Sequence, residues 1–255
     1  MFDRETTPGV AVIRFDRPKV NAINTEMLLD ILQVCRQLES DTDVRSVVLT
    51  GGDRNFAAGA DITAFPGFDH ADALEFSHRF NAAALALENL PQITVSAING
   101  FALGGGLELA LATDFRIAAA DARLGLPEIL LGIIPGGGGT QRLSRLVGIT
   151  LAKELVYTGR NLDAEEALAA GLISAIYEPD AVQAAALEMA STYAAGPASL
   201  RIAKRVMLAG CHLPLEVAAE IEADGFAEAF TTDDKIIGVS SFIEHGPGRA
   251  IFTGT

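Results

Sequence analysis

The sequence predicts an α/β protein with a parallel sheet at its core, and three observations support this class. β-Branched apolar runs alternate with segments of helical spacing through residues 10–120, a pattern typical of βαβ units. With 255 residues, 49% of them hydrophobic, the chain can bury one full core. From residue 196 onward the spacing is helical only. We therefore predict a core over residues 1–195 and a helical oligomerisation region over residues 196–255.

Most of the elements in the first half are closed by glycine or proline, as at Pro18 after the first strand and Pro91 after the long helix. Asn24 or Thr25 suits the N-cap of the first helix. In chain order the predicted elements are a strand at 9–17, a helix at 25–40, a strand at 44–52, a helix at 71–90, a strand at 93–100, a short helix around Glu108 and a strand at 114–120.

The second half is mainly helical. A faint strand–loop–helix recurrence at 44–90 and 93–113 suggests a stacked architecture earlier in the chain, although two imperfect copies are weak evidence of a repeat. The predicted elements are helices at 140–148, 150–159 and 163–171, a short strand at 172–178, and helices throughout the region after Gly196.

Composition excludes several functional classes. A net charge of −14 argues against binding to nucleic acid or to an anionic membrane. Cys35 and Cys211 lie far apart, without metal-ligand spacing, which favours a reducing, cytoplasmic setting. No run is apolar and long enough to span a bilayer. We assign no metal site and no role to the histidines, His70, His78, His212 and His245.

Glu108 is the one charged residue between Phe101 and Ala112. Its neighbours one helical turn away are glycines, leucine and alanine, so this helix has no polar face and Glu108 is expected to be buried. Burial raises the pKa of a carboxyl group. Such a residue is either a structural glutamate paired with an arginine or an acid–base group of a site.

Two glycine-containing turns follow predicted strands, at 55–62 and 100–108. Small residues there let backbone N–H groups face a ligand, and two converging amides would form an oxyanion hole. For either turn taken alone, tight packing is the favoured explanation. Glu128, a second glutamate in an apolar context, makes the combination hard to ascribe to packing alone. The patterns GxGxxG, GxxxxGK, HExxH and GxSxG do not occur.

These motifs resemble the crotonase superfamily, and most closely enoyl-CoA hydratase. The resemblance runs in order over nearly the whole chain, and it implies a spiral of ββα repeats followed by helices that build trimers, often paired into hexamers. It is carried by NFAAGADI (55–62), NGFALGGGLELALATDFRIA (99–118), LGLPEILLGIIPGGGGTQRL (124–143) and FTTDDKIIGVSSFIE (230–244).

The resemblance implies a role for four residues in the chemistry. The backbone amides of Ala60 and Gly105 would form the oxyanion hole, and Glu108 and Glu128 would be the two catalytic carboxylates. A water held between the carboxylates would attack Cβ of a 2-enoyl thioester while a proton reaches Cα. The amides would hold the enolate-like thioester oxygen.

The resemblance also implies a coenzyme A site, with coenzyme A as part of the substrate and no separate cofactor. The adenine would lie near the carbonyls of Ala22, Ala58 and Ala60, and the phosphates near Arg54. Many hydratases carry lysine where this chain has Thr63. The contact between that lysine and a phosphate of coenzyme A is therefore not expected here. Further residues expected to contact the substrate are Asp61, Ile62, Thr63, Gly104 and Phe226.

Two alternatives remain open at this point. A Δ3,Δ2-enoyl-CoA isomerase is the nearest one, although many isomerases keep only one of the two glutamates. The other is a non-catalytic scaffold of the same fold that binds RNA or coenzyme A, against which the intact glutamates and the acidic charge both argue. The acyl chain length is expected to depend on residues 62–87.

Overall fold

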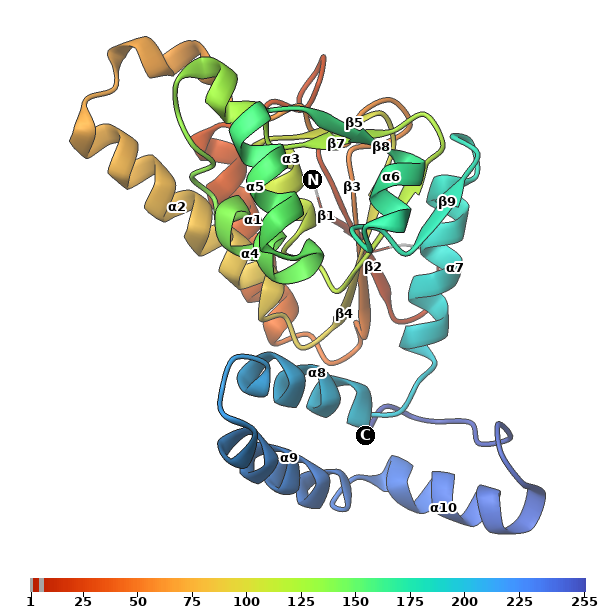
Figure 1. Ribbon diagram of the computed structural model, residues 1–255. Coiled ribbons are helices and arrows are strands. Elements are labelled where there is room, and N and C mark those ends of the chain that lie inside the picture. The colour runs from red at the N-terminus through yellow and green to blue at the C-terminus, as the bar shows by residue number, and fades with distance from the viewer. Residues whose placement is uncertain (1, 5–6) are drawn as a thin grey trace.

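A six-stranded sheet forms the centre of the computed structural model, which describes residues 2–4 and 7–255 (Figure 1). Its neighbouring strands are parallel except for the first pair, which is antiparallel. β3 and β4 are buried along their whole length, as expected for a sheet covered on both faces. The strand order is β1 (Phe2–Arg4), β2 (Val10–Arg14), β3 (Ser46–Thr50), β4 (Ile93–Ile98), β6 (Phe115–Ala119) and β9 (Ala175–Tyr177).

A second, smaller sheet is formed by three short strands, β5 (Phe101–Leu103), β7 (Arg123–Gly125) and β8 (Asn161–Asp163). In chain order β5 follows β4, β7 follows β6 and β8 follows the helix α5 (Ile149–Thr158). Ala57, which follows β3, pairs with Ala102 of β5 through an isolated parallel bridge. Successive turns of the chain therefore stack in two layers, each turn closing with a helix. This arrangement confirms the predicted α/β spiral of ββα repeats.

Helices cover both faces of the main sheet. α1 (Thr25–Glu39) and α2 (His70–Glu88) pack together, and α7 (Val182–Ala194) packs on β3 and β4. Asn24 caps α1 by accepting from Met27 N, as predicted. The remaining helices of the core are α3 (Gly105–Ala110), α4 (Gly139–Val147), α5 (Ile149–Thr158), α6 (Ala164–Ala169) and the 3₁₀ turns η1 (Ile62–Gly67) and η2 (Pro127–Leu131).

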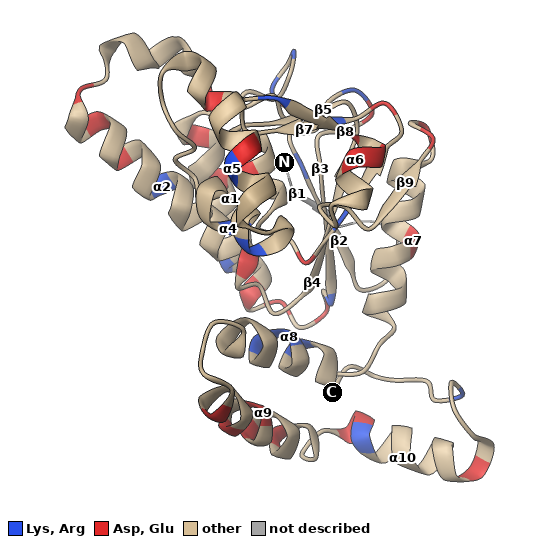
Figure 2. Ribbon diagram, viewed as in Figure 1, with Lys and Arg blue, Asp and Glu red and all other residues tan. Residues whose placement is uncertain are grey.

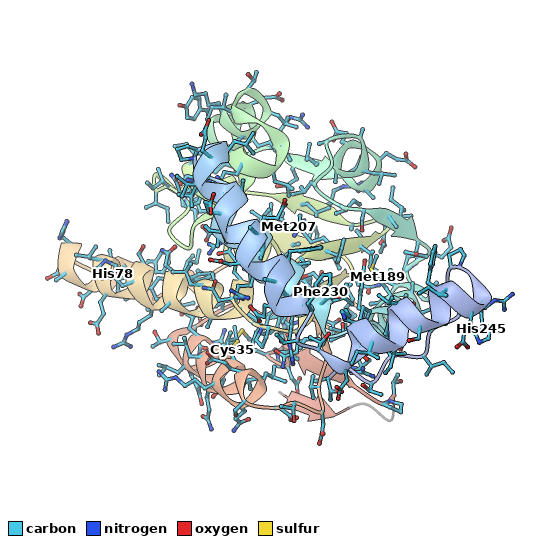
Figure 3. All side chains as sticks on the ribbon, turned by 90° about the horizontal axis from the view of Figure 1, so that it is seen from below. Cys35, His78, Met189, Met207, Phe230 and His245 are labelled. Atoms are coloured by element: carbon cyan, nitrogen blue, oxygen red, sulfur yellow. The ribbon has the colours of Figure 1, made fainter. Side chains whose placement is uncertain are left out.

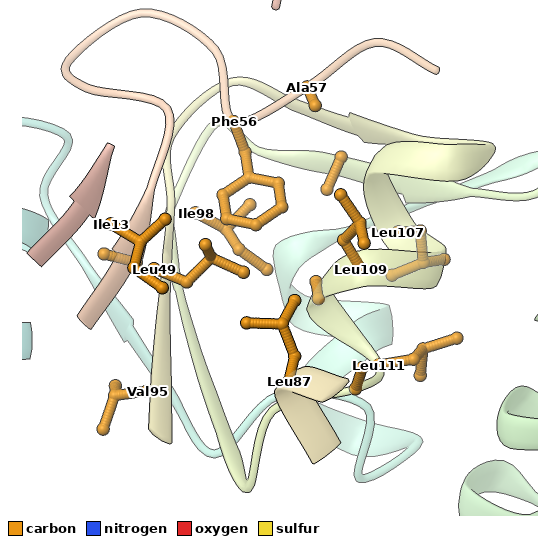
Figure 4. Packing of buried hydrophobic residues seen from close by; sticks show 14 of the residues in the cluster. Ile13, Leu49, Phe56, Ala57, Leu87, Val95, Ile98, Leu107, Leu109 and Leu111 are labelled. Carbon is orange, nitrogen blue, oxygen red and sulfur yellow. The ribbon is translucent and has the colours of Figure 1, made fainter. Parts of the chain in front are cut away.

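The apolar core lies between the sheet, α1 and α2, and α3 enters it directly (Figure 4). Leu107 and Leu109 of α3 are completely buried, and Phe56 packs beside them. Gly106 has no room for a side chain, because a Cβ there would lie 2.1 Å from the carbonyl oxygen of Ala57. The glycine run thus allows α3 to approach the second sheet closely.

Three helices form the C-terminal layer: α8 (Ser199–Gly210), α9 (Leu215–Ala229) and α10 (Asp233–His245). Residues 246–255 are not helical, so the prediction of helix throughout this region is wrong at its end. A buried contact anchors the layer, because Lys204 Nζ donates to Asp114 Oδ2 and to Gln92 O, each at 2.8 Å. Acidic residues lie along α9, whereas Lys and Arg gather on α8 (Figure 2).

Candidate active site

A cavity of about 880 Å³ opens between α2 and the segment 132–141. Four of the residues predicted for the chemistry line it together, namely Ala60, Gly105, Glu108 and Glu128. They come from three parts of the chain, since Ala60 lies in the loop before η1, Gly105 and Glu108 lie in α3, and Glu128 lies in η2. The fold therefore brings both predicted carboxylates and both predicted amides to one space.

Glu108 lies in the first turn of α3 and is only 2% exposed. Its Oε1 accepts two hydrogen bonds, from Gly137 N and Gly139 N, both at 2.7 Å. Burial raises the pKa of Glu108, while the two backbone donors and the charge of Arg142 oppose that rise. A Cβ on Gly137 or Gly139 would lie within 3 Å of the carboxylate, so glycine is needed at both positions.

Glu128 faces the same cavity from η2, with Oε2 buried and without a hydrogen-bond partner among the described residues. Burial, and secondarily the charge of Glu108, raise the pKa of Glu128 to about 7. A Cβ on Gly104 would lie 2.8 Å from Glu128 Oε1, and Gly104 has a positive φ of 50°. Near neutral pH this pair of carboxyl groups can hold one proton between them.

The backbone amides of Gly105 and Ala60 both lack a partner within their own elements. Gly105 is the first residue of α3, so its N–H has no carbonyl one turn earlier in the helix. Ile23 bonds to the residues on either side of Ala60, accepting from Asp61 N at 2.7 Å and donating to Gly59 O at 2.8 Å. A Cβ on Gly105 would lie 3.5 Å from Ala60 N. The two amides are thus close enough to share one acceptor.

The outer wall of the cavity is aromatic and aliphatic. Phe65, Phe68, Phe76 and Phe80 form a continuous series of ring contacts with centroid separations of 5.3 to 6.1 Å. Aliphatic side chains from α2 and from residues 133–135 complete this wall. Within the described part of the chain, no Lys or Arg lines the cavity. Such a space suits an uncharged acyl group.

The residues predicted to contact coenzyme A lie largely outside this cavity. Arg17 links two of them, donating to Ala22 O at 2.8 Å and to Asp61 Oδ2 at 2.6 Å. Asp61 also accepts from the Thr63 hydroxyl at 2.6 Å. The hydrogen bond from Ala58 N to Val20 O joins the same two loops.

Four further predicted contacts are placed as follows. Gly104 is the N-cap of α3, immediately before Gly105. Ile62 is 46% exposed at the start of η1, and Arg54 is also exposed. Phe226 is 67% exposed on α9 and packs on Phe230 with centroids 4.9 Å apart. Phe226 does not line the cavity of its own chain.

Sequence reasoning did not identify the residues that hold Glu108. Gly137 and Gly139 belong to the run GGGG at 136–139, which lies within the family motif at 124–143 but was assigned no role. Four glycines in succession expose backbone N–H groups, and this feature could have suggested an anion-holding loop. Ser77, Asn81 and Arg142, which contact this loop, carry no comparable signal in the sequence.

The histidines remain without a common site. His78 and His245 lie at opposite ends of the molecule (Figure 3), and His70 lines the outer part of the cavity. No group of three or more potential metal-ligating side chains is found among the described residues. Nor does any described helix have the length and apolar character needed to cross a membrane.

Comparison with known proteins gives matches along almost the whole chain. Residues 5–249 match the family model described as enoyl-CoA hydratase/isomerase. A short-chain-enoyl-CoA hydratase of Clostridium acetobutylicum is 40% identical over 238 residues, which cover 92% of this chain and 91% of the relative. A mitochondrial methylglutaconyl-CoA hydratase of Mus musculus is 38% identical over 252 residues, covering 96% and 80%. The crystal structure of an enoyl-CoA hydratase from Bacillus anthracis superposes with a TM-score of 0.94 at 35% identity, covering 100% and 99%.

Proposed function

The chain belongs to the enoyl-CoA hydratase/isomerase family, and on this premise we propose that its cavity hydrates short-chain 2-enoyl-CoA thioesters. One observation supports the proposal above all. Glu108 and Glu128 face one cavity beside Ala60 and Gly105, whose backbone amides donate to no other backbone group among the described residues. The enzyme is a hydro-lyase in this proposal, and coenzyme A is part of its substrate, with no separate cofactor.

The proposed reaction uses the two carboxyl groups in complementary states. Glu108, ionised and oriented by two backbone donors, takes a proton from water as the water oxygen bonds to Cβ. The electron pair of the double bond moves toward the thioester carbonyl, whose oxygen becomes enolate-like between the amides of Ala60 and Gly105. Glu128 then donates a proton to Cα, and its pKa of about 7 allows it to carry that proton near neutral pH.

The coenzyme A moiety is proposed to follow the linked loops outside the cavity. The carbonyls of Ala22 and Ala58 would face the adenine, and Arg54 would lie near the phosphates. Hydrogen bonds between these loops support a preformed surface, because Ile23 and Val20 bond directly to the segment 58–61. The thioester would then enter the cavity beside Ala60.

The acyl group is proposed to be short and uncharged. An acyl chain bearing a second carboxylate, such as the substrate named for the mouse relative, would need a cation in the cavity. The aromatic wall provides none among the described lining residues. We expect crotonyl-CoA to be hydrated with a much higher kcat/KM than methylglutaconyl-CoA.

The experiment follows the loss of enoyl absorbance with crotonyl-CoA and with methylglutaconyl-CoA at equal concentrations. Equal kcat/KM values would contradict the uncharged acyl group but leave hydration intact. Conversion of a 3-enoyl-CoA without hydration of crotonyl-CoA would instead identify an isomerase. If crotonyl-CoA, methylglutaconyl-CoA and the 3-enoyl-CoA all fail to react, the non-catalytic scaffold would be favoured.

Assembly into trimers, alone or paired as hexamers, is also proposed. Phe226, Phe230, Ile236 and Ile243 are each more than half exposed on α9 and α10, which leaves an apolar surface that a partner would cover. Light scattering should give a mass three or six times that of the 26.7 kDa chain. A mass near that of one chain, with full activity, would refute the trimer. A cytoplasmic location is proposed from the two widely separated cysteines, and a role in β-oxidation from the family resemblance.

A further inference from the structure

The glycine loop 136–139 holds the carboxylate of Glu108, but the loop contains no side chain with which to hold itself. Both hydrogen bonds that Glu108 accepts come from this loop, at Gly137 N and Gly139 N. Glycine is the residue with the greatest backbone freedom, so an unsupported run of four would not fix two donors on one oxygen atom. Groups outside the loop must therefore set its conformation.

Helix α2 supplies two of these groups. Ser77 Oγ and Asn81 Nδ2 both donate to the carbonyl oxygen of Gly136, each at 2.7 Å. Asn81 Nδ2 also donates to Ser77 O of its own helix at 3.0 Å, so its amide is fixed on α2. With the Gly136 carbonyl turned toward α2, the following N–H groups turn toward Glu108.

Arg142 of α4 supplies the third support. Its guanidinium donates to Gly137 O at 3.2 Å and forms a two-pronged ion pair with Glu88 of α2, at 3.2 and 2.7 Å. The Arg142 side chain is 13% exposed and that of Glu88 is 29% exposed, so the pair is partly shielded from water. Arg142 thus ties the loop to the far end of α2.

We infer that Ser77, Asn81 and Arg142 are positioning residues that orient loop 136–139, and through it the Glu108 carboxylate, for the reaction. This inference rests on the proposed hydration. None of the three touches the reacting atoms in this role. They act by keeping two backbone donors on Glu108 Oε1, so that the carboxylate is held in one orientation at the cavity.

The pH dependence of activity gives a readout that a purely structural role would not change. The titratable groups around Glu108 are Glu128 from η2 and Arg142 from α4, the latter paired with Glu88 of α2, and His70 lies farther out on the cavity wall. Loss of the Arg142 charge and of ordered loop donors raises the pKa of Glu108. Because Glu108 acts in its ionised form, activity should then appear only at higher pH.

The main test compares Arg142→Met with Arg145→Met. Arg145 lies on the same helix, is exposed and bonds only within α4, to Gln141, so it controls for the lost charge. For Arg142→Met we expect kcat with crotonyl-CoA to fall about tenfold or more with KM within about threefold, because the lost alignment acts in the transition state. The acidic limb of the kcat/KM profile should rise by about half a pH unit or more. Arg145→Met should leave both unchanged.

Two further variants keep the test decisive. Arg142→Lys retains the charge without the two-pronged geometry, so it should restore the acidic limb but only part of kcat. If Arg142→Met does not fold, the double variant Ser77→Ala/Asn81→Ala replaces it, with the same fall in kcat expected. A kcat within about threefold of wild type in the folded variants, with an unchanged pH profile, would overturn the inference, since positioned acid–base groups contribute far more.

Hydrogen–deuterium exchange separates this inference from the proposed reaction. The amides of Gly137 and Gly139 should be protected in the wild-type protein and should exchange faster in Arg142→Met but not in Arg145→Met. If the wild-type protein does not hydrate crotonyl-CoA, the proposed function fails, while exchange still reports on the loop. Unchanged exchange of residues 136–139 in the variants would overturn the positioning role itself.

Discussion

Replacing Glu128 by Gln tests the proposed proton donor, and it should lower activity while raising stability. Gln has nearly the same shape as Glu but carries no transferable proton. We expect kcat with crotonyl-CoA to fall by about 10²- to 10⁴-fold, the range that a positioned acid–base group contributes. KM should stay within several-fold of wild type, because the lost interaction acts in the transition state.

The expected gain in stability follows from the pKa of Glu128. Burial raises this pKa from 4.5 to about 7, a difference that corresponds to about 3.5 kcal/mol at roughly 1.4 kcal/mol per pKa unit. A group whose pKa is raised on folding contributes its full stability below the unfolded value and loses it as pH rises through the folded value. Wild-type stability should therefore decline between pH 4.5 and pH 7 through this group.

The assay is urea unfolding of wild type and Glu128→Gln at about pH 5 and about pH 8, bracketing the titration. At the higher pH the variant should be more stable by about 1–3 kcal/mol, the lower figure allowing for solvent screening in the open cavity. The difference should shrink at the lower pH. Retention of kcat within about tenfold would refute the catalytic assignment, and equal stability at the higher pH would refute the burial argument.

Three other substitutions test neighbouring parts of the reasoning. Glu108→Gln should lower kcat to a similar degree, and combining it with Glu128→Gln should cost much less than the sum, since both groups act on one water; full additivity would count against a shared water. Gly106→Ala should destabilise by more than about 3 kcal/mol in thermal unfolding, because its Cβ would meet a carbonyl oxygen at 2.1 Å; a stability loss below about 1 kcal/mol would contradict that packing. Lys204→Met should cost about 2–4 kcal/mol in urea unfolding by leaving the Asp114 carboxylate without its cation, and a change near zero would show that the ion pair does not hold α8 to the core.

Local sequence patterns were sufficient for the main elements and drew attention to Glu108, Glu128 and the two glycine turns, whereas the roles of Ala60 and Gly105 were implied by the family resemblance. Hydrophobic spacing predicted β2, β3, β4 and β6 and the helices between them, because burial repeats with the period of each element. Glu108 stood out because burying a carboxylate in an apolar run costs free energy unless other groups compensate for the lost hydration. The glycine turns indicated free amides near Ala60 and Gly105, and both line the cavity with the two glutamates.

The short strands β1, β5, β7 and β8 were not predicted. Each has three residues, too few to show a period, and their pairing joins segments far apart in the chain. Register of this kind depends on which strands become neighbours after folding, not on the residues of one strand. The same holds for Ala57, whose bridge to Ala102 closes the second layer.

The sequence by itself determined that two glutamates lie in apolar surroundings and that two glycine turns exist, since apolar context and backbone freedom are properties of local composition. Only the tertiary structure decided that loop 136–139 holds Glu108, and that Ser77, Asn81 and Arg142 hold the loop. Those hydrogen bonds join α2, α4 and the loop across up to 59 positions. Hydrogen bonds need partners within about 3 Å, and that proximity arises only when the packed helices place distant residues side by side.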